Sequence, residues 1–205
     1  MSRLLLVRHG DTASNSRERY WGHSDVKLSR AGLGQAEKLR DRLTSEKINV
    51  IYASDLERSW LTAQIIAQKH QLDINICPEL REFNFGVVEG LTFDEISRLH
   101  PELAEFWASQ NPKLKFPGGE SLGDLRRRVN RFRQRLEKHT PEETVLIVAH
   151  AGALRILLCQ LLGIGQHHWR QLRLNLASLS IVEIYPERTV LGLLNDVSHL
   201  DSELQ

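Results

Sequence analysis

Three short runs of apolar residues constrain the fold of this sequence more than any other feature. They occupy residues 4–7, 50–53 and 144–149, and polar residues flank each of them. Continuous, largely apolar runs of this length are typical of strands that are buried on both faces of a parallel sheet. Helical patterns lie between them, and the clearest, at residues 122–136, repeats apolar residues at alternating steps of three and four. This alternation predicts an α/β fold, a three-layer α/β/α sandwich around a mostly parallel central sheet.

Local patterns predict where several other elements lie. Two further strands are expected at residues 178–185 and 189–194. Residues 54–57 read Ser-Asp-Leu-Glu, which has the form of a capping box and predicts the start of a helix that contains Arg58. Residues 111–119 hold two Pro and two Gly, so we expect a surface loop between helices or a segment that shapes the mouth of a site.

Length, charge and cysteine content limit the possible classes of function. A chain of 205 residues is long enough for one substantial core, so residues 1–205 are expected to form a single domain. Its 27 Lys and Arg balance 26 Asp and Glu, so no net field favours nucleic acid or an anionic membrane as a partner. Cys77 and Cys159 have no metal-ligand spacing, and Cys159 is expected in the core because it lies in an apolar run. Without an export or membrane-spanning segment, a cytoplasmic location is expected.

Several other kinds of site lack support in the sequence. No Gly-x-x-x-x-Gly-Lys-Ser/Thr loop occurs, which argues against a P-loop kinase or ATPase. The string at residues 32–34, Gly-Leu-Gly, lacks a preceding strand and a third Gly, so it does not predict a dinucleotide site. His167 and His168 are adjacent, and no His-Glu-x-x-His motif occurs, so no zinc site is expected. The consecutive arginines at 126–128 have no interleaved aromatic residues, which favours a solvated helix face over a nucleic-acid surface.

Basic side chains, two Arg and two His, follow the three predicted strands. Arg8 and His9 follow the first strand. Arg58 lies near the helix start after the second strand, and His150 directly follows the third. Ligands of an open α/β sheet bind beyond the carboxyl ends of its strands, where two Arg and two His would together hold a dianion such as phosphate. Each of these residues alone is ordinarily structural or solvated, and only their joint placement favours a phosphate site.

The chain also carries a series of short motifs that occupy nearly its whole length. They are Leu6-Val7-Arg8-His9-Gly10-Asp11-Thr12 with Asn15, Tyr20-Trp21-Gly22-His23, Leu28-Ser29-x-x-Gly32, Ser54-x-Leu56-x-Arg58-x-x-x-Thr62-Ala63, Leu80-x-Glu82-x-x-Phe85-Gly86-x-x-Glu89-Gly90, Pro117-Gly118-Gly119-Glu120-Ser121 and Val148-Ala149-His150-x-Gly152. In this order they resemble the signature of the histidine phosphatase superfamily, the phosphoglycerate mutase-like enzymes. Any one string would be weak, but their shared order argues against chance similarity. The resemblance implies the phosphoglycerate mutase-like fold.

The resemblance also implies roles for individual residues. His9 is the implied nucleophile, and Glu82 is the implied proton donor. The implied phosphate-binding residues are Arg8, Asn15, Gly22, Arg58, His150 and Ala151. Among these, Arg8, Arg58 and His150 also count as catalytic, because they hold the phosphoryl group during its transfer. Their charges do the work that magnesium does in other phosphoryl-transfer enzymes, so neither a metal nor another cofactor is expected.

The string around Glu82 suggests a branch of the superfamily. Glu82 followed by Phe85-Gly86-x-x-Glu89-Gly90 resembles the phosphatases that include α-ribazole phosphatases and broad-specificity phosphatases. Mutases of the family carry an Arg-His-Tyr-Gly string and a longer insertion instead. We therefore expect a phosphomonoesterase with α-ribazole 5′-phosphate as the first candidate substrate, ahead of phosphoserine, phosphoglycerates or a broad range. A phosphoglycerate mutase and a non-catalytic phosphate-ester binding module are the alternatives.

Features outside the phosphate site leave substrate and assembly open. Asp11 departs from the longer Glu or Gln common in the family, which affects substrate contacts more than chemistry. Five residues either line an outer wall that packs on an organic group or belong to the core. They are Trp21, His23, Phe85, Trp107 and Phe116. A homodimer is one possibility, and Trp169 and residues 178–185 are the candidates for its interface.

Overall fold

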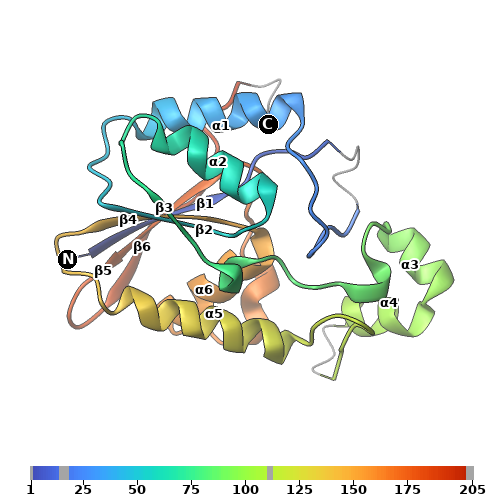
Figure 1. The fold of residues 1–205 in the computed structure, drawn as a ribbon. Helices are drawn as coiled ribbons and strands as arrows, with labels where there is room; N and C mark the ends of the chain where they lie inside the picture. The colour runs from blue at the N-terminus through green and yellow to red at the C-terminus, as the bar shows by residue number, and fades with distance from the viewer. Residues whose placement is uncertain (1, 14–18, 110–112, 202–205) are drawn as a thin grey trace.

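The computed structural model describes residues 2–13, 19–109 and 113–201, and a six-stranded sheet lies at its centre (Figure 1). The strands are β1 (Ser2–Arg8), β2 (Val50–Ala53), β3 (Ile74–Ile76), β4 (Thr144–Ala149), β5 (Leu179–Ile184) and β6 (Thr189–Asp196). Their order across the sheet is β3-β2-β4-β1-β5-β6, and β5 runs antiparallel to both of its neighbours. The pairs among β1, β2, β3 and β4 are parallel, which confirms the mostly parallel sheet that the sequence predicts.

Helices cover both faces of this sheet (Figure 1). One face carries α1 (Arg30–Leu43) and α2 (Glu57–Ala67), and the opposite face carries α5 (Leu122–Leu136) and α6 (Ala151–Leu162). A hairpin of α3 (Phe93–Leu99) and α4 (Pro101–Ala108) lies to one side of the sheet. Short 3-10 turns are η1 (Pro78–Leu80), η2 (Gly86–Val88) and η3 (Gln166–Gln171). The predicted three-layer sandwich is confirmed.

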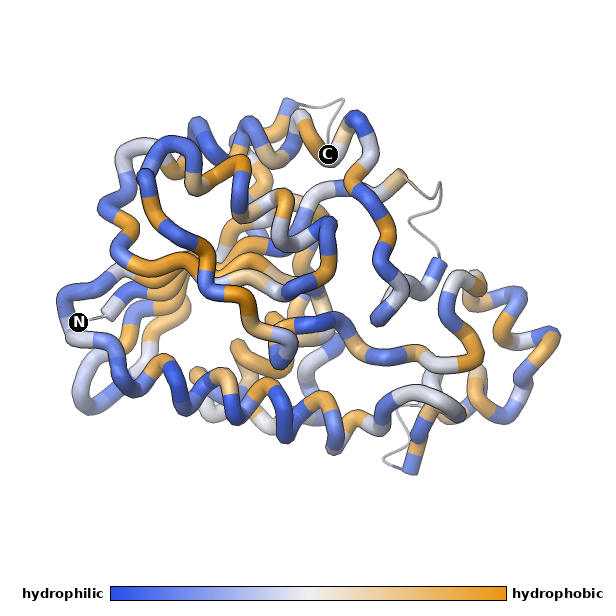
Figure 2. The backbone as a smooth tube through the Cα atoms, viewed as in Figure 1, coloured by the Kyte–Doolittle hydropathy of each residue, from blue (hydrophilic) through white to orange (hydrophobic). Residues whose placement is uncertain are grey.

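The apolar runs form strands because both of their faces are covered. In β1, Leu4 and Leu6 pack into the core on the α5 and α6 side, whereas Leu5 and Val7 pack into the core on the α1 and α2 side. All four are at most 1% exposed. A strand that is buried on both faces has no position for polar residues, which is why the run is continuous rather than alternating. Figure 2 shows this concentration of hydrophobic residues in the strands and the hydrophilic outer side of α5.

The predicted start of α2 is wrong by two residues. The cap of the helix is Leu56, which has no side-chain cap hydrogen bond, and Ser54 does not act as a cap. The backbone N–H of Ser54 instead donates to Val148 O at 3.2 Å, which continues the pairing of β2 with β4. Asp25 supplies the missing acceptor from another segment, because its Oδ1 accepts the N–H of Glu57 at 2.7 Å. Arg58 does lie in the helix, as predicted.

Three other features differ from the sequence prediction. The pattern did not reveal β3, since a strand of three residues at the sheet edge is too short to show an alternation. Within the described part of the loop predicted at 111–119, Leu114 and Phe116 are buried, so this segment contributes to the core as well as to the surface. Arg128 is 7% exposed and does not lie on the solvated face that was expected for it, whereas Arg127 is exposed.

Most of the candidate interface residues are buried. Trp169 is 4% exposed, and β5 lies inside the sheet between β1 and β6, whereas residues 183–185 are partly exposed. The homodimer and its interface stay a prediction. Among the described residues, no helix is both long enough and apolar enough to cross a membrane.

Candidate active site

The parallel pairing of β1 with β4 brings two histidines together at the carboxyl ends of these strands. Arg8 pairs with Ala149 in the register, and His9 N donates to Ala149 O at 3.0 Å. His150 follows directly after β4, and its ring centroid lies 4.9 Å from that of His9. Arg58, the second residue of α2, reaches the same place from the neighbouring strand β2. The structure therefore brings together the Arg and His residues that the sequence predicts to converge.

His9 lines a cavity of about 1070 Å³, although its side chain is only 6% exposed. Its Nδ1 lies 2.7 Å from Gly10 O. Because a carbonyl only accepts hydrogen bonds, Nδ1 carries the proton and Nε2 keeps a free lone pair. Burial, followed by the positive charges of Arg58 and Arg8, holds the pKa of His9 well below its ordinary value of 6.5. At neutral pH this imidazole is uncharged, as a nucleophile must be.

His150 lies next to His9 but is not among the residues that line the cavity. It is fully buried, and neither of its ring nitrogens has a hydrogen-bond partner among the described residues. Burial lowers its pKa well below 6.5, and the charges of Arg58 and His9 lower it further. A buried polar group without a partner is costly, so this imidazole is suited to a ligand atom that reaches it through the cavity.

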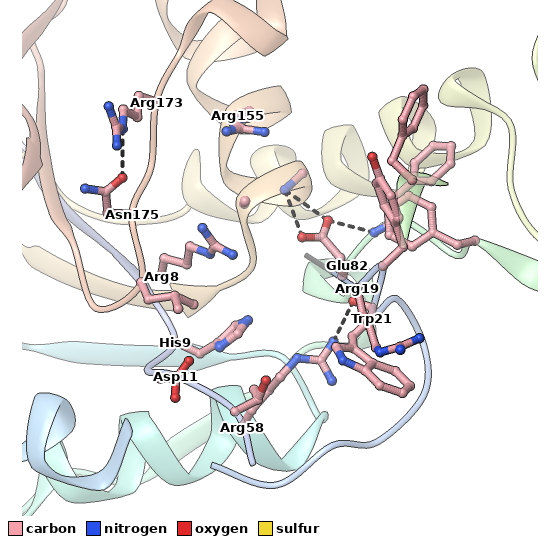
Figure 3. A pocket seen from close by; sticks show the side chains of 18 of the residues that line it. Arg8, His9, Asp11, Arg19, Trp21, Arg58, Glu82, Arg155, Arg173 and Asn175 are labelled. Atoms are coloured by element: carbon pink, nitrogen blue, oxygen red, sulfur yellow. Dashed lines mark hydrogen bonds between the residues drawn. The ribbon is translucent and has the colours of Figure 1, made fainter. Parts of the chain in front are cut away.

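Two arginines border the cavity beside His9 (Figure 3). Arg8 donates from Nη1 to Leu174 O at 2.7 Å, and its Nε has no partner in the described part of the chain. Burial, with smaller effects of Arg155 and Arg58, lowers the pKa of Arg8 to about 10, so it stays charged at neutral pH. Arg58 donates from Nη1 to Ser24 O and from Nη2 to Gly22 O, at 2.8 and 2.7 Å. These bonds fix the direction in which the guanidinium faces the cavity.

Glu82 lines the cavity from the opposite side and reaches the N-terminus of α6 (Figure 3). The backbone N–H of Gly152 lies 2.9 and 3.1 Å from its two carboxylate oxygens, and the N–H of Phe83 donates to Oε1 at 2.8 Å. A Cβ added at Gly152 would lie 2.2 Å from Oε1, so only glycine permits this approach. A neutral imidazole, two arginines and a carboxylate around one cavity are the groups that phosphoryl transfer requires.

The remaining predicted phosphate ligands are placed differently from one another. Ala151, at the first position of α6, lines the cavity. Gly22 does not line it, and its carbonyl instead accepts a hydrogen bond from Arg58. Asn15 lies outside the described residues. In the described part of the chain, no group of three or more His, Cys, Asp or Glu side chains is placed to hold a metal ion.

A model of the histidine phosphatase superfamily (branch 1) matches residues 4–197. The chain belongs to the histidine phosphatase superfamily. It is 34% identical over 200 residues to phosphoserine phosphatase 1 of Hydrogenobacter thermophilus. This alignment covers 98% of this chain and 95% of that protein. It is also 34% identical over 207 residues to a probable phosphoglycerate mutase, GpmB, of Yersinia pestis, with 98% and 96% covered.

A solved structure extends the similarity to the whole fold. It is a putative alpha-ribazole-5′-P phosphatase from Escherichia coli K-12, which matches with a TM-score of 0.87 at 29% identity. The match covers 96% of this chain and 98% of that one. The phosphoglycerate mutase-like fold expected from the sequence motifs is thus confirmed.

The lining of the cavity of this histidine phosphatase is partly aromatic. Tyr20 and Trp21 line it and are partly exposed, whereas Phe83, Phe85, Trp107 and Trp169 line it from the core, where each is at most 8% exposed. His23 does not line it, and Phe116 is 1% exposed and packs edge-on against Phe85 in the core. The cavity of this enzyme is therefore larger than a phosphate group alone requires, and part of its lining is aromatic.

Several cavity residues were not identified from the sequence. Arg155 and Arg173 line the cavity, and Arg155 is one helical turn after Ala151 on α6. Helical spacing from Ala151 could have indicated Arg155, since residues four apart share a helix face. Glu89 was noted only as part of a motif. Its carboxylate accepts the backbone N–H groups of residues 22, 23 and 24, and so shapes the segment that Arg58 holds.

The lowered pKa values of His9 and His150 predict how stability changes with pH. The unfolded chain binds a proton at each histidine as the pH falls through about 6.5, whereas the folded chain does not. The free energy of unfolding therefore falls with decreasing pH below about 6.5, by up to about 1.4 kcal/mol per pH unit for each histidine, and they cause no such change at higher pH. His9→Gln should lower the slope of the unfolding free energy against pH by up to about 1.4 kcal/mol per pH unit, which corresponds to one proton. Urea unfolding from about pH 7 to 5 measures this slope.

The matched control for this experiment is His167→Gln, because His167 is exposed. We expect the slope of the control to equal that of the wild type. Equal slopes in all three proteins would show that His9 is protonated to the same extent in the folded and the unfolded chain.

Proposed function

We propose that this histidine phosphatase hydrolyses a small organic phosphate monoester through a covalent phosphohistidine on His9. One observation carries the proposal. His9, whose Nε2 is unprotonated, lines the same cavity as Arg8, Arg58 and Glu82, and the charges of both arginines act on its ring. This arrangement supplies a nucleophile, positive charge for the phosphoryl oxygens and a proton donor for the leaving group.

The proposed reaction has two steps. In the first, Nε2 of His9 forms a bond to phosphorus while the bond from phosphorus to the ester oxygen breaks, and protonated Glu82 gives its proton to the departing alkoxide. In the second, water attacks phosphorus, the Nε2–P bond breaks, and Glu82 takes up a proton from that water. Inorganic phosphate and the free imidazole result. Nδ1 stays bonded to Gly10 O throughout, which keeps the ring oriented.

The positive charge for this reaction comes from the chain itself in our proposal. Arg8 and Arg58 line the cavity and face the equatorial oxygens of the phosphoryl group. His150 does not line the cavity, but it lies next to His9 and has a ring N–H to donate to an oxygen that reaches it. Burial strengthens these contacts because it removes competing water. We therefore propose that no metal ion takes part.

The proposed first candidate substrate is α-ribazole 5′-phosphate. The partly exposed rings of Tyr20 and Trp21 suit a planar base, and the cavity is larger than a phosphate requires. The similarity to the putative alpha-ribazole-5′-P phosphatase supports the same choice. Phosphoserine is the second candidate, because phosphoserine phosphatase 1 of Hydrogenobacter thermophilus is similar over nearly the full length of both chains.

A first prediction tests the covalent intermediate. After rapid quenching at alkaline pH, where phosphohistidine survives, the intact mass of the wild type should show one added phosphoryl group, and EDTA should not prevent this. His9→Ala should show none, while His70→Ala, which removes a histidine that does not line the cavity, should behave as the wild type. An adduct that persists in His9→Ala would identify another nucleophile, and loss of the adduct in EDTA would contradict the metal-free reaction.

A second prediction concerns Glu82. A general acid matters most for poor leaving groups, so Glu82→Gln should slow phosphorylation by an alkyl phosphate by roughly 10²–10⁴-fold and by p-nitrophenyl phosphate far less. Single-turnover measurement is required, because the same carboxylate acts again in the second step. Equal slowing with both esters would mean that the proton donor is a different group.

A third prediction tests the substrate. We expect kcat/KM to be higher for α-ribazole 5′-phosphate than for phosphoserine or 3-phosphoglycerate, with free phosphate rather than an isomer as the product. Trp21→Leu should lower kcat/KM for the ribazole ester by roughly threefold to tenfold and leave phosphoserine nearly unchanged, because only the base stacks on an aromatic wall. Trp60→Leu, a replacement of an exposed tryptophan on α2, is the control. A preference for phosphoserine would favour the second candidate, and isomer formation would favour a mutase.

A further inference from the structure

The segment that carries Glu82 has no regular secondary structure. Residues 81–85 belong to neither a helix nor a strand. No helix or sheet therefore fixes this backbone along its length, although Phe83 in the middle of the segment is 1% exposed. Backbone N–H groups bond Asn84 O and Phe85 O, whereas the carbonyls of Arg81 and Glu82 accept from a side chain.

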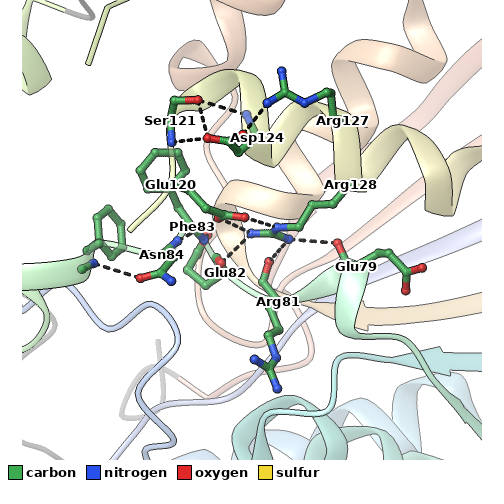
Figure 4. A network of polar contacts seen from close by, with 12 residues as sticks. Glu79, Arg81, Glu82, Phe83, Asn84, Glu120, Ser121, Asp124, Arg127 and Arg128 are labelled. Atoms are coloured by element: carbon green, nitrogen blue, oxygen red, sulfur yellow. Dashed lines mark hydrogen bonds and ion pairs between the residues drawn. The ribbon is translucent and has the colours of Figure 1, made fainter. Parts of the chain in front are cut away.

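Arg128 of α5 is the side chain that holds the carbonyls of Arg81 and Glu82 (Figure 4). Its Nη1 donates to Glu79 O and Arg81 O at 2.9 and 2.6 Å, and its Nη2 donates to Glu82 O at 2.7 Å. The remaining donors pair with the carboxylate of Glu120, at 2.7 Å from Nε and 2.9 Å from Nη2. All five N–H groups of the guanidinium are thus used, and three of them hold the backbone that leads into Glu82.

Glu120 completes this network on the other side of the segment. One of its oxygens accepts the N–H of Asn84 at 3.0 Å, and its own N–H donates to Asn84 O at 3.0 Å. Burial raises the pKa of the Glu120 carboxyl, but the hydrogen bonds and the charge of Arg128 outweigh burial, so the pKa is lowered. Arg128 and Glu120 therefore form an ion pair whose hydrogen bonds hold the backbone from Glu79 to Asn84.

The carboxylate of Glu82 depends on the position of this backbone. Its contacts with Gly152 N and Phe83 N are short, and the absence of a Cβ at Gly152 makes room for them. Arg81, the residue before Glu82, is tied at its side chain to Asp55 by two hydrogen bonds of 2.8 and 2.5 Å. A shift of the carbonyls that Arg128 holds would therefore move the Glu82 carboxylate relative to α6 and to His9.

We propose that Arg128 is a positioning residue for the proton donor Glu82. This inference rests on the proposed function, because it assumes that Glu82 protonates the leaving group. Arg128 does not line the cavity and so does not touch the substrate. It sets the place of the acid, and its replacement should impair the part of the reaction that needs a proton and spare phosphate binding.

The test compares Arg128→Lys with Arg127→Lys. Lysine keeps the charge but places its donors on one atom, so it cannot hold three carbonyls and the carboxylate of Glu120 together. We expect Arg128→Lys to slow single-turnover phosphorylation by an alkyl phosphate about 10- to 100-fold, since small misplacements of a catalytic group have effects of this size. Phosphorylation by p-nitrophenyl phosphate should change less than about threefold. Arg127 is exposed and pairs only with Asp124 among the described residues, so Arg127→Lys should match the wild type.

A double variant tests whether Arg128 acts through Glu82. In Arg128→Lys combined with Glu82→Gln, the alkyl ester should react no more slowly than with Glu82→Gln alone, because the acid is already absent. Vanadate affinity, which reports the phosphate-binding groups, should stay within about threefold of the wild type in Arg128→Lys. Arg128→Met with Glu120→Gln, which leaves no unpaired buried charge, should show the same difference between esters.

The outcomes separate this inference from the function on which it rests. If Glu82→Gln shows the difference between esters and the Arg128 variants slow both esters equally, Arg128 has only a structural role and the inference is wrong. Additive losses in the double variant would also overturn it. If Glu82→Gln itself shows no difference between esters, the proposed role of Glu82 fails first.

Discussion

The parallel pairing of β1 with β4 is the interaction on which the rest of the site depends. Its last hydrogen bond, from His9 N to Ala149 O, places two histidines from sequence positions 9 and 150 in ring contact. The two strands tolerate no polar interior position because helices cover both faces of the sheet, so the polar residues appear where the strands end. A rigid core thus positions the first half of the site.

The cost of burying positive charge determines how the arginines of the site are held. Arg8 and Arg58 are withdrawn from water beside His9, and backbone carbonyls of Leu174, Gly22 and Ser24 accept hydrogen bonds from them in compensation. The same burial and the same charges lower the pKa of His9. One arrangement therefore keeps the imidazole neutral and provides an anion site beside it, because the positive field disfavours a proton on the ring and favours a phosphoryl group.

The carboxylate side of the site is built in a different way. Residues 81–85 have no helix or strand to hold them, and a buried ion pair between Arg128 and Glu120 fixes their backbone. Such a pair gains little stability over apolar packing, but it requires one geometry to satisfy all of its hydrogen bonds. In this fold the requirement coincides with the segment that carries Glu82 (Figure 4). The pair therefore contributes a fixed backbone position for this segment more than it contributes stability.

The sequence by itself determined the buried strands, the alternation with helices and the convergence of Arg8, His9, Arg58 and His150, because continuous apolar runs and strand ends are local signals. Tertiary structure decided what depends on contacts between distant residues. Asp25 replaced the expected cap at Ser54, and Arg128, expected to be solvated, became buried against carbonyls about fifty residues away in sequence. Hydrogen bonds between such distant segments leave no periodic pattern, so only the folded chain shows them.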